Sequence, residues 1–357
     1  MVIFAPNYSI IRPNCVKMVS FYAKLLRLIY MPLITTNMDL AIHDLHAGKP
    51  VAIPTETVYG LAALITHEQA IKAVFAMKDR PLNHPLIVHV AANYDLSELV
   101  EDIPEYAAHL IKKFWPGPLT LVLRARKDRI NPLITGGQTT VAIRCPAHPV
   151  AQELLATLKT PVVAPSANPF GKISPTTAQH VSESFHDKEL TILDGGRCTV
   201  GIESTIIDAT QTETHQILRH GLIEEQAIAE VTTTPSLNQH NALRVPGKLD
   251  SHYQPQKTLY YFEHYEQLSN FCQKSTETIY VIAGQKPIRI DASHFHHFAN
   301  SPEQAAFELY YQLRQADAST AQCIVIELPP NSAIWQGVRE RILKAGTPGS
   351  SSDISRV

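Results

Sequence analysis

Cysteine is scarce in this chain of 357 residues, and the few cysteines stand apart from one another. There are five, an odd number, and no two of them form a C-x-x-C pair. This pattern argues against a disulfide framework and a cysteine-rich zinc site, and it favours a reducing, cytoplasmic location. The 17 histidines are also dispersed, and the small groups at 43–46 and 294–297 lack the partner ligands of a metal site. We therefore expect no protein-bound metal.

The chain also lacks an excess of charge of either sign and a long apolar run. It has 31 Lys and Arg against 33 Asp and Glu, so any contact with nucleic acid requires a local patch. A membrane span needs about 20 apolar residues in a row, and Lys17, Lys24 and Arg27 interrupt the apolar N-terminal residues. A short signal-like segment stays open, because basic residues precede an apolar run. We treat residues 1–37 as an extension and expect no membrane partner.

Several familiar motifs are missing. The chain has no G-x-x-x-x-G-K-[ST], G-x-G-x-x-G, H-E-x-x-H or G-x-S-x-G sequence, which removes the signals for P-loop, dinucleotide-binding, zinc-protease and esterase sites. Its 45% hydrophobic and 18% charged residues are ordinary for a folded protein. The length favours two domains.

Alternating apolar runs and amphipathic segments predict an α/β fold with a mixed sheet. In the first domain, residues 38–231, we expect helices at 39–47, 68–78, 104–114, 150–158, 175–184 and 224–230. We expect strands there at 51–53, 86–90, 119–123, 139–144, 161–164, 190–193, 204–208 and 215–218. A polar, proline-bearing linker at 232–257 precedes a small α/β unit at 258–346, with strands at 258–262, 278–282 and 323–328 and helices at 302–315 and 333–344. Residues 347–357 are predicted to be a disordered tail.

Polar side chains follow many of the expected strands. Ser166 and Asn168 come directly after a short apolar strand, and their spacing places both on one face if the extended geometry persists. Because ligands of open α/β sheets bind where strand ends converge, this distribution predicts one concave site. Its cations and hydroxyls suit an anionic ligand such as a triphosphate with a carboxylate. The polar groups concerned are Thr55, Thr57, Lys78, Arg80, His89, Thr140, Arg144, Ser166, Asn168, Ser204, Thr205 and Arg219.

The segments Lys78–Arg80 and Ser166–Asn168 together resemble the K-x-R and S-x-N motifs of the YrdC-type domain, the catalytic domain of threonylcarbamoyl-AMP synthases. Residues 54–60, 115–123, 161–168 and 203–208 are also similar to that family, so the resemblance covers about 39–231. It implies a twisted mixed sheet with flanking helices around a concave site. Residues 258–346 resemble the smaller, Rossmann-like C-terminal domain of the two-domain members.

The resemblance implies that L-threonine, bicarbonate and ATP are converted to threonylcarbamoyl-AMP and pyrophosphate for threonylcarbamoyl-adenosine in tRNA. Mg²⁺ is expected with the ATP, without a dedicated protein site, and tRNA or a downstream transfer complex is a possible further partner. The linker would close the site as a gate through Lys248 and Tyr253. The matching catalytic residues are Lys78, Arg80, Ser166 and Asn168. Threonine would contact Thr57, His89, Arg144, Ala164 and Ser204, and ATP would contact Arg80, His84, Thr140, Ser166, Ser174 and Arg219.

The chain departs from the family pattern at a few positions. His84 stands where asparagine is common, His220 interrupts an Arg-Pro-Gly pattern, and the linker only partly matches the family's motif. Two alternatives stay open. One is an RNA-binding module without adenylation activity, for which the basic run at 124–129 is a candidate surface. The other is a related carbamoyl-AMP transferase, although the zinc-finger cysteines usual in those proteins are not visible.

Overall fold

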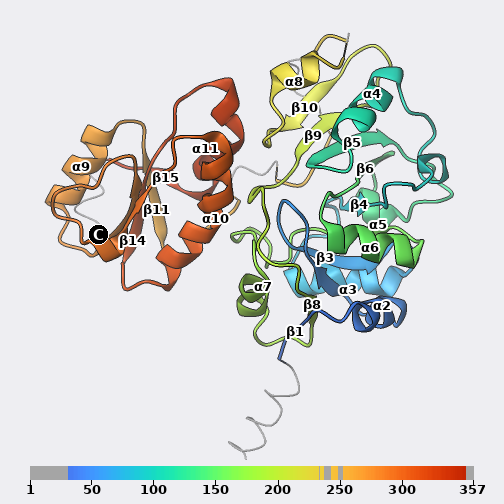
Figure 1. Cartoon of the computed structure of the whole chain (residues 1–357), viewed down its shortest axis with the longest axis horizontal. Helices are drawn as coiled ribbons and strands as arrows, with labels where there is room; N and C mark the ends of the chain where they lie inside the picture. Colours follow the sequence, from blue (N-terminus) through green and yellow to red (C-terminus); the bar gives the residue numbers. More distant parts are fainter. Residues whose placement is uncertain (1–30, 233, 237–242, 248–251, 351–357) are drawn as a thin grey trace, which may run out of the picture.

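The computed structural model describes residues 31–232, 234–236, 243–247 and 252–350. Two sheets, each with its own helices, lie side by side (Figure 1). In the described chain, the first sheet has the strand order β1-β8-β2-β3-β7-β4-β6-β5-β9-β10 and mixes parallel and antiparallel pairs. The second has the order β13-β12-β14-β11-β15 with every pair parallel. The mixed α/β architecture predicted from the sequence is confirmed.

The first sheet is built from short strands with apolar residues on both faces. Along β2, Val51 and Ile53 pack on one face while Ala52 packs on the other, as the two-residue period of a strand requires. The strands are β1 (Leu33–Thr35), β2 (Val51–Ile53), β3 (Gly60–Leu64), β4 (Ile87–His89), β5 (Leu119–Arg124), β6 (Thr140–Arg144), β7 (Val162–Val163), β8 (Thr191–Leu193), β9 (Thr205–Asp208) and β10 (Gln216–Arg219).

Helices cover the two faces of this sheet. One core joins α3, α4 and α7 to the sheet, and a second joins α2 and α6 to the opposite face. A third, smaller core contains Val245 from the linker, so the linker crosses the sheet over β4, β6, β5, β9 and β10. The helices are α2 (Met38–His46), α3 (Glu68–Lys78), α4 (Glu105–Phe114), α5 (Pro132–Thr135), α6 (Pro149–Leu158), α7 (Ala178–Ser184) and α8 (Glu225–Ala229), with a 3₁₀ turn at Leu96–Glu98.

The end of α3 shows how local sequence places functional groups. Ile71, Val74 and Phe75 form the buried stripe that makes this segment helical. The helix stops because Asp79 adopts a left-handed conformation with φ of 51°, and Pro81 disfavours helical geometry for the residue before it. Lys78 and Arg80 are therefore held at a helix end, as the sequence predicts.

The second domain packs helices on both faces of its parallel sheet. Helix α9 lies on one face, while α10 and α11 lie on the other, toward the first domain (Figure 1). Val58, Ile202 and Tyr253 of the preceding chain join the core around α10 and α11, so the two domains share apolar packing. The elements are β11 (Thr258–Phe262), α9 (Tyr265–Lys274), β12 (Ile279–Ala283), β13 (Phe295–His297), α10 (Pro302–Ala318), β14 (Cys323–Glu327), α11 (Gln336–Ala345) and β15 (Thr347–Pro348), with 3₁₀ turns at Ala292–His294 and Ala333–Trp335.

The expected helices and strands are confirmed within a few residues, but the structure adds elements at both ends. β1 lies inside the range assigned to the N-terminal extension, yet Leu33–Thr35 pair with β8. β15 lies in the range assigned to a disordered tail, yet it pairs with β11. Both are edge strands of two or three residues, too short for an alternation to show in the sequence. Helices α5 and α9 and strands β3 and β13 were also not predicted. No described helix is long and apolar enough to cross a membrane.

Candidate active site

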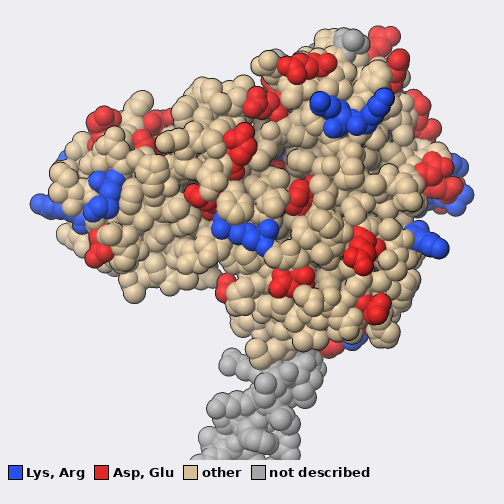
Figure 2. All heavy atoms as spheres, viewed as in Figure 1, with Lys and Arg blue, Asp and Glu red and all other residues tan. Residues whose placement is uncertain are grey.

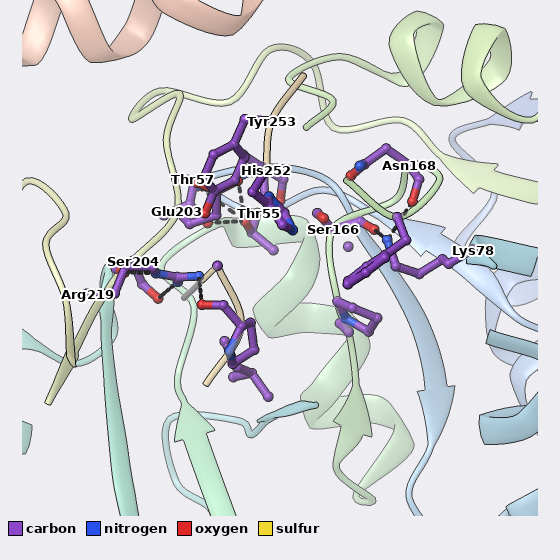
Figure 3. A pocket seen from close by; sticks show the side chains of 18 of the residues that line it. Thr55, Thr57, Lys78, Ser166, Asn168, Glu203, Ser204, Arg219, His252 and Tyr253 are labelled. Carbon is purple, nitrogen blue, oxygen red and sulfur yellow. Dashed lines mark hydrogen bonds between the residues drawn. The ribbon is translucent and has the colours of Figure 1, made fainter. Parts of the chain in front are cut away.

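The strand ends of the first sheet converge on one pocket, as predicted (Figure 3). His89 at the end of β4 pairs in register with Arg144 at the end of β6, which in turn faces Thr120 of β5. The free volume of the pocket is about 50 Å³. The predicted residues that line it are Thr57, Lys78, Arg80, His89, Arg144, Ala164, Ser166, Asn168, Ser204, Arg219 and Tyr253.

Lys78 joins the two predicted motifs directly. Its side chain is 1% exposed, and its ammonium group donates hydrogen bonds to the carbonyl oxygens of Ser166 and Asn168. Burial, and then the charge of Arg80, hold the pKa of Lys78 well below its usual value. The Asn168 amide nitrogen donates to the Pro169 and Lys172 carbonyls, at 2.8 and 2.9 Å, and fixes the loop that follows.

Arg80 lies beside this cluster on the wall of the pocket. Its guanidinium donates to the Pro85 carbonyl at 2.8 Å and stands 5.4 Å from the centre of the Phe170 ring. Burial lowers the pKa of Arg80 to about 10, which still leaves the group charged at neutral pH. Arg80 therefore presents a positive charge beside the buried Lys78.

Arg144 also lines the pocket and is already partnered. One of its terminal nitrogens donates to the Thr57 hydroxyl at 2.6 Å, and the other lies 2.7 Å from a carboxylate oxygen of Glu56. The Thr57 hydroxyl is also 2.8 Å from that of Thr55. Glu56 was not singled out from the sequence, because nothing there indicates that a residue next to Thr57 turns toward β6. A carboxylate ligand of Arg144 would share the guanidinium with Glu56.

Ser204 and Arg219 form a third group, between β9 and β10. The Arg219 guanidinium donates to the Ser204 carbonyl and hydroxyl at 3.0 and 3.1 Å, and to the Pro246 carbonyl at 3.1 Å. The Ser204 hydroxyl lies 2.7 Å from that of Thr120. Burial lowers the pKa of Arg219 from its usual value. This group ties the strand ends to the linker.

His89 is a neutral side chain at the floor of the pocket. Burial, followed by the nearby charge of Arg144, lowers its pKa to about 3. Its Nδ1 lies 3.2 Å from the Ile87 carbonyl, which suits the tautomer protonated at Nδ1. His89 then offers a hydrogen-bond acceptor, and not a charge, at neutral pH.

The linker returns over the pocket at His252 and Tyr253 (Figure 3). Tyr253 is 1% exposed and has a left-handed backbone, with φ of 63°. The Gln254 amide donates to the Gly171 carbonyl at 2.8 Å, so the linker is attached to the loop after Asn168. Gly247 is required beneath it, since an added Cβ would lie 2.4 Å from the Tyr253 hydroxyl. The other expected gate residue, Lys248, lies outside the described residues.

The comparisons with known proteins agree with this geometry. A family model for Sua5, YciO and YrdC proteins, described as "Telomere recombination", matches residues 43–221. A second, "Threonylcarbamoyl-AMP synthase, C-terminal domain", matches residues 218–347. The threonylcarbamoyl-AMP synthase of Pyrococcus abyssi is 36% identical over 323 residues, which cover 87% of this chain and 94% of the relative. This chain belongs to the threonylcarbamoyl-AMP synthase family.

Other members of the threonylcarbamoyl-AMP synthase family support the assignment. The Bacillus subtilis enzyme is 33% identical over 312 residues, covering 84% of this chain and 90% of the relative. The crystal structure of Pyrococcus abyssi Sua5 complexed with L-threonine has a TM-score of 0.78 at 32% identity, covering 89% of this chain and 99% of that one. The names of these relatives agree with the main sequence prediction and with neither alternative.

Three residues that the family resemblance assigned to ATP lie outside this pocket. The His84 ring packs edge-on against Phe170, 5.1 Å between centroids, and so stands behind the pocket wall. Thr140 begins β6 and lines a separate surface pocket with Arg124 and Lys127. It is four residues from Arg144, and at about 3.3 Å per residue the two lie at opposite ends of the strand. The Ser174 hydroxyl is directed to Glu203, at 2.6 Å. Their contacts with ATP stay predictions.

The lining of the pocket also includes residues that were not among the predicted site residues, and the aromatic or charged side chains among them are Phe170, Glu203 and His252. The His252 ring packs edge-on against Phe170, 5.8 Å between centroids, so both close the same side of the pocket. Glu203 precedes Ser204, and its position beside a predicted residue was the one available signal. Among the described residues, no group of three or more His, Cys, Asp or Glu side chains is placed to hold a metal ion.

Proposed function

We propose that this protein is a threonylcarbamoyl-AMP synthase that forms L-threonylcarbamoyladenylate and pyrophosphate from L-threonine, bicarbonate and ATP. The observation that carries the proposal is the meeting of the Lys78–Arg80 motif with Ser166 and Asn168 in one buried pocket, opposite Arg144. A cationic wall for phosphates and a separate arginine for a carboxylate are what this reaction requires. The relative solved with L-threonine supports the choice of amino acid.

We infer the roles of the residues from the family resemblance and from their placement. Arg144 pairs with the threonine carboxylate, while Thr57 and Ser204 offer hydroxyls and neutral His89 accepts a hydrogen bond. The threonine amine, once deprotonated, attacks the carbon of CO₂ derived from bicarbonate and forms a carbamate. A carbamate oxygen then attacks the α-phosphorus of ATP and displaces pyrophosphate, with no covalent enzyme intermediate.

The cations act on the phosphate charge. Arg80 and Arg219, assisted by Lys78, stabilise the negative charge that builds as pyrophosphate leaves. Lys78 uses two of its three donors on backbone carbonyls, so the third is available to a phosphate oxygen. Mg²⁺ would supply further charge neutralisation on the phosphates. It would arrive with the nucleotide, because the nearby carboxylates already have protein partners. Glu203 accepts hydrogen bonds from Ser174 and Tyr310, and Glu56 pairs with Arg144.

We infer that the linker moves when ATP binds, because His252 and Tyr253 line the pocket and its free volume of about 50 Å³ is far too small for a nucleotide. Tyr253 and His252 occupy the space over the cations, and Gln254 is attached to Gly171 by one backbone hydrogen bond. We therefore retain Tyr253 as a residue of the gate, which closes after the substrates enter and keeps water from the adenylate.

The alternative of an RNA-binding module without catalysis requires a basic surface. On the face shown in Figure 2, acidic and basic groups are interspersed and no extended basic field is present. Because the relatives are named as synthases, we place tRNA, or a complex that transfers the product to tRNA, downstream of this site. The cytoplasmic location inferred from the cysteines likewise stays a prediction; the four described cysteines are buried and free.

The test is pyrophosphate release from ATP and bicarbonate, with and without L-threonine. Wild type should release pyrophosphate only with threonine, and Lys78→Ala and Ser166→Ala should lose on the order of 100-fold in rate, since misplacement by about 1 Å can cost that much. Lys72→Ala is the matched control, because Lys72 lies on the same helix with its side chain 44% exposed. EDTA should stop release and added Mg²⁺ restore it. Threonine-independent release, or salt-sensitive tRNA binding with no release, would refute the proposal.

A further inference from the structure

The last helix of the second domain lies directly against the active-site wall of the first. Gly337 on α11 packs on the backbone of Gly221, where an added Cβ would be 2.5 Å from the Gly221 carbonyl oxygen. One turn further along the helix, Arg341 is fully buried. Lys344 donates to the carbonyl of Gly247 in the linker. The same face of α11 therefore reaches both the sheet and the linker.

Arg341 binds two separate segments of the first domain. Its Nε donates to a carboxylate oxygen of Glu203 at 3.1 Å, and one terminal nitrogen lies 3.3 Å from the Glu203 carbonyl oxygen. The other terminal nitrogen donates to the His220 carbonyl. Arginine's planar fork can make these contacts at the same time, whereas a lysine ammonium lacks that geometry.

Each of these segments carries a residue of the proposed site. Glu203 is followed by Ser204, proposed to contact threonine, and His220 is preceded by Arg219, proposed to contact ATP. Ser204 and Arg219 are themselves joined by two hydrogen bonds. These contacts and the chain itself form a closed ring: Arg341 contacts Glu203 and His220, and their neighbours Ser204 and Arg219 contact each other. Ser204 and Arg219 line the pocket (Figure 3), whereas Arg341 lies on the side of the ring away from it.

Glu203 is the ionised carboxylate of this ring. Burial works to raise its pKa, but the charges of Arg341 and Arg219 and the hydrogen bond from Ser174 outweigh it and lower the pKa from its usual value. The Tyr310 hydroxyl, from α10 of the second domain, also donates to Glu203 at 2.9 Å. Two of the groups that hold this carboxylate therefore come from the second domain.

We propose that Arg341 is a positioning residue for the active site, so that the second domain completes the site by fixing Ser204 and Arg219. This inference rests on the proposed function, because it assigns those two residues to substrate binding. It gives α11 a role in the reaction beyond packing the domains together.

Helix α11 offers a matched control. Arg339 is also buried, and it donates to the Glu263 carboxylate at 2.8 and 3.1 Å and to the Pro329 carbonyl, both within the second domain. Arg339→Lys and Arg341→Lys make the same chemical change two residues apart on one helix. Only the second change touches contacts with the first domain.

The experiment measures pyrophosphate release by the full chain at varied threonine and ATP, together with thermal unfolding. Arg341→Lys should raise KM for threonine on the order of tenfold and also raise KM for ATP, because Ser204 and Arg219 are misplaced. Arg339→Lys should keep both KM values within twofold of wild type, even where it lowers Tm. Equal KM values in wild type and Arg341→Lys, or equal changes in both variants, would overturn the inference.

A second pair keeps the test decisive if Arg341→Lys does not fold. Tyr310→Phe removes only the hydroxyl that binds Glu203, whereas Tyr280→Phe removes one that binds Gln312 inside the second domain at 3.2 Å. We expect KM for threonine to increase in Tyr310→Phe and to stay unchanged in Tyr280→Phe. No increase in Tyr310→Phe would overturn the inference. Wild type that releases no pyrophosphate would refute the proposed function itself, which separates the two failures.

Discussion

Replacing Arg144 by lysine tests the proposed recognition of threonine most directly. The substitution keeps the positive charge opposite Glu56 but removes the planar fork that would hold a carboxylate through two hydrogen bonds. It also removes the bond to the Thr57 hydroxyl, at 2.6 Å, and the longer one to the Gly117 carbonyl, at 3.3 Å. Arg144→Lys should therefore weaken the binding of threonine while keeping the positive charge of the pocket.

The magnitude follows from the hydrogen bonds lost. One hydrogen bond to a charged group contributes about 1.5–3 kcal/mol, so losing one of two bonds to the carboxylate should raise KM for threonine about 10- to 150-fold. KM for ATP should change little, because the phosphate-binding groups Lys78 and Arg80 lie on another wall. The loss should appear as a linear dependence of rate on threonine up to concentrations that saturate wild type.

The assay is pyrophosphate release over a threonine series at saturating ATP. Arg124→Lys is the control: Arg124 lies on β5, in the strand next to Arg144, but it is exposed and donates to the Thr210 carbonyl at 3.1 Å. It should leave both KM values unchanged. If Arg144→Lys binds threonine within twofold of wild type while KM for ATP rises, Arg144 serves the nucleotide and the reasoning is refuted.

Two further predictions concern stability and the shape of the pocket. His89, His180 and His252 each have a pKa lowered to about 3 by burial. Lowering the pH from 7.5 to 5 should cost about 2 kcal/mol of unfolding free energy for each of them, because below about pH 6.5 the unfolded chain binds a proton that the folded chain excludes. A denaturant midpoint that does not move would contradict this. Gly60→Ala should cost about 1–3 kcal/mol by overpacking and lower kcat/KM, since its Cβ would lie 2.9 Å from that of Ala164; Gly284→Ala, which meets only the flexible Glu327 side chain at 3.5 Å, should be nearly neutral in the same assays.

Much of this site could be predicted from the sequence because its residues sit at the ends of recognisable elements. Lys78 follows a regular amphipathic helix, and Ser166 follows a buried apolar strand, so local patterns place both near one edge of the sheet. The family resemblance implied the linker's course over that edge, and the linker is long enough to cross the first domain.

The residues that were missed owe their positions to distant partners. Glu203 lies at the pocket because Arg341, 138 residues later, holds it there. The Ser174 hydroxyl donates a hydrogen bond to the same carboxylate, a pairing that neither segment indicates. Glu56 turns toward Arg144, and no pattern within either segment indicates that pairing. β1 and β15 were missed because edge strands this short gain their stability from one neighbour each.

The position of Arg341 so late in the chain has a consequence for synthesis on the ribosome. Domains fold in order as they emerge, at about 5–20 residues per second, so the first domain and linker can fold before α11 exists. The about 90 residues between Tyr253 and Arg341 add about 5–20 s during which the pocket is present without the residue that holds its outer side. Until α11 has been made and has packed, the growing chain should therefore have a poorly formed site and bind threonine and ATP less tightly than the finished enzyme.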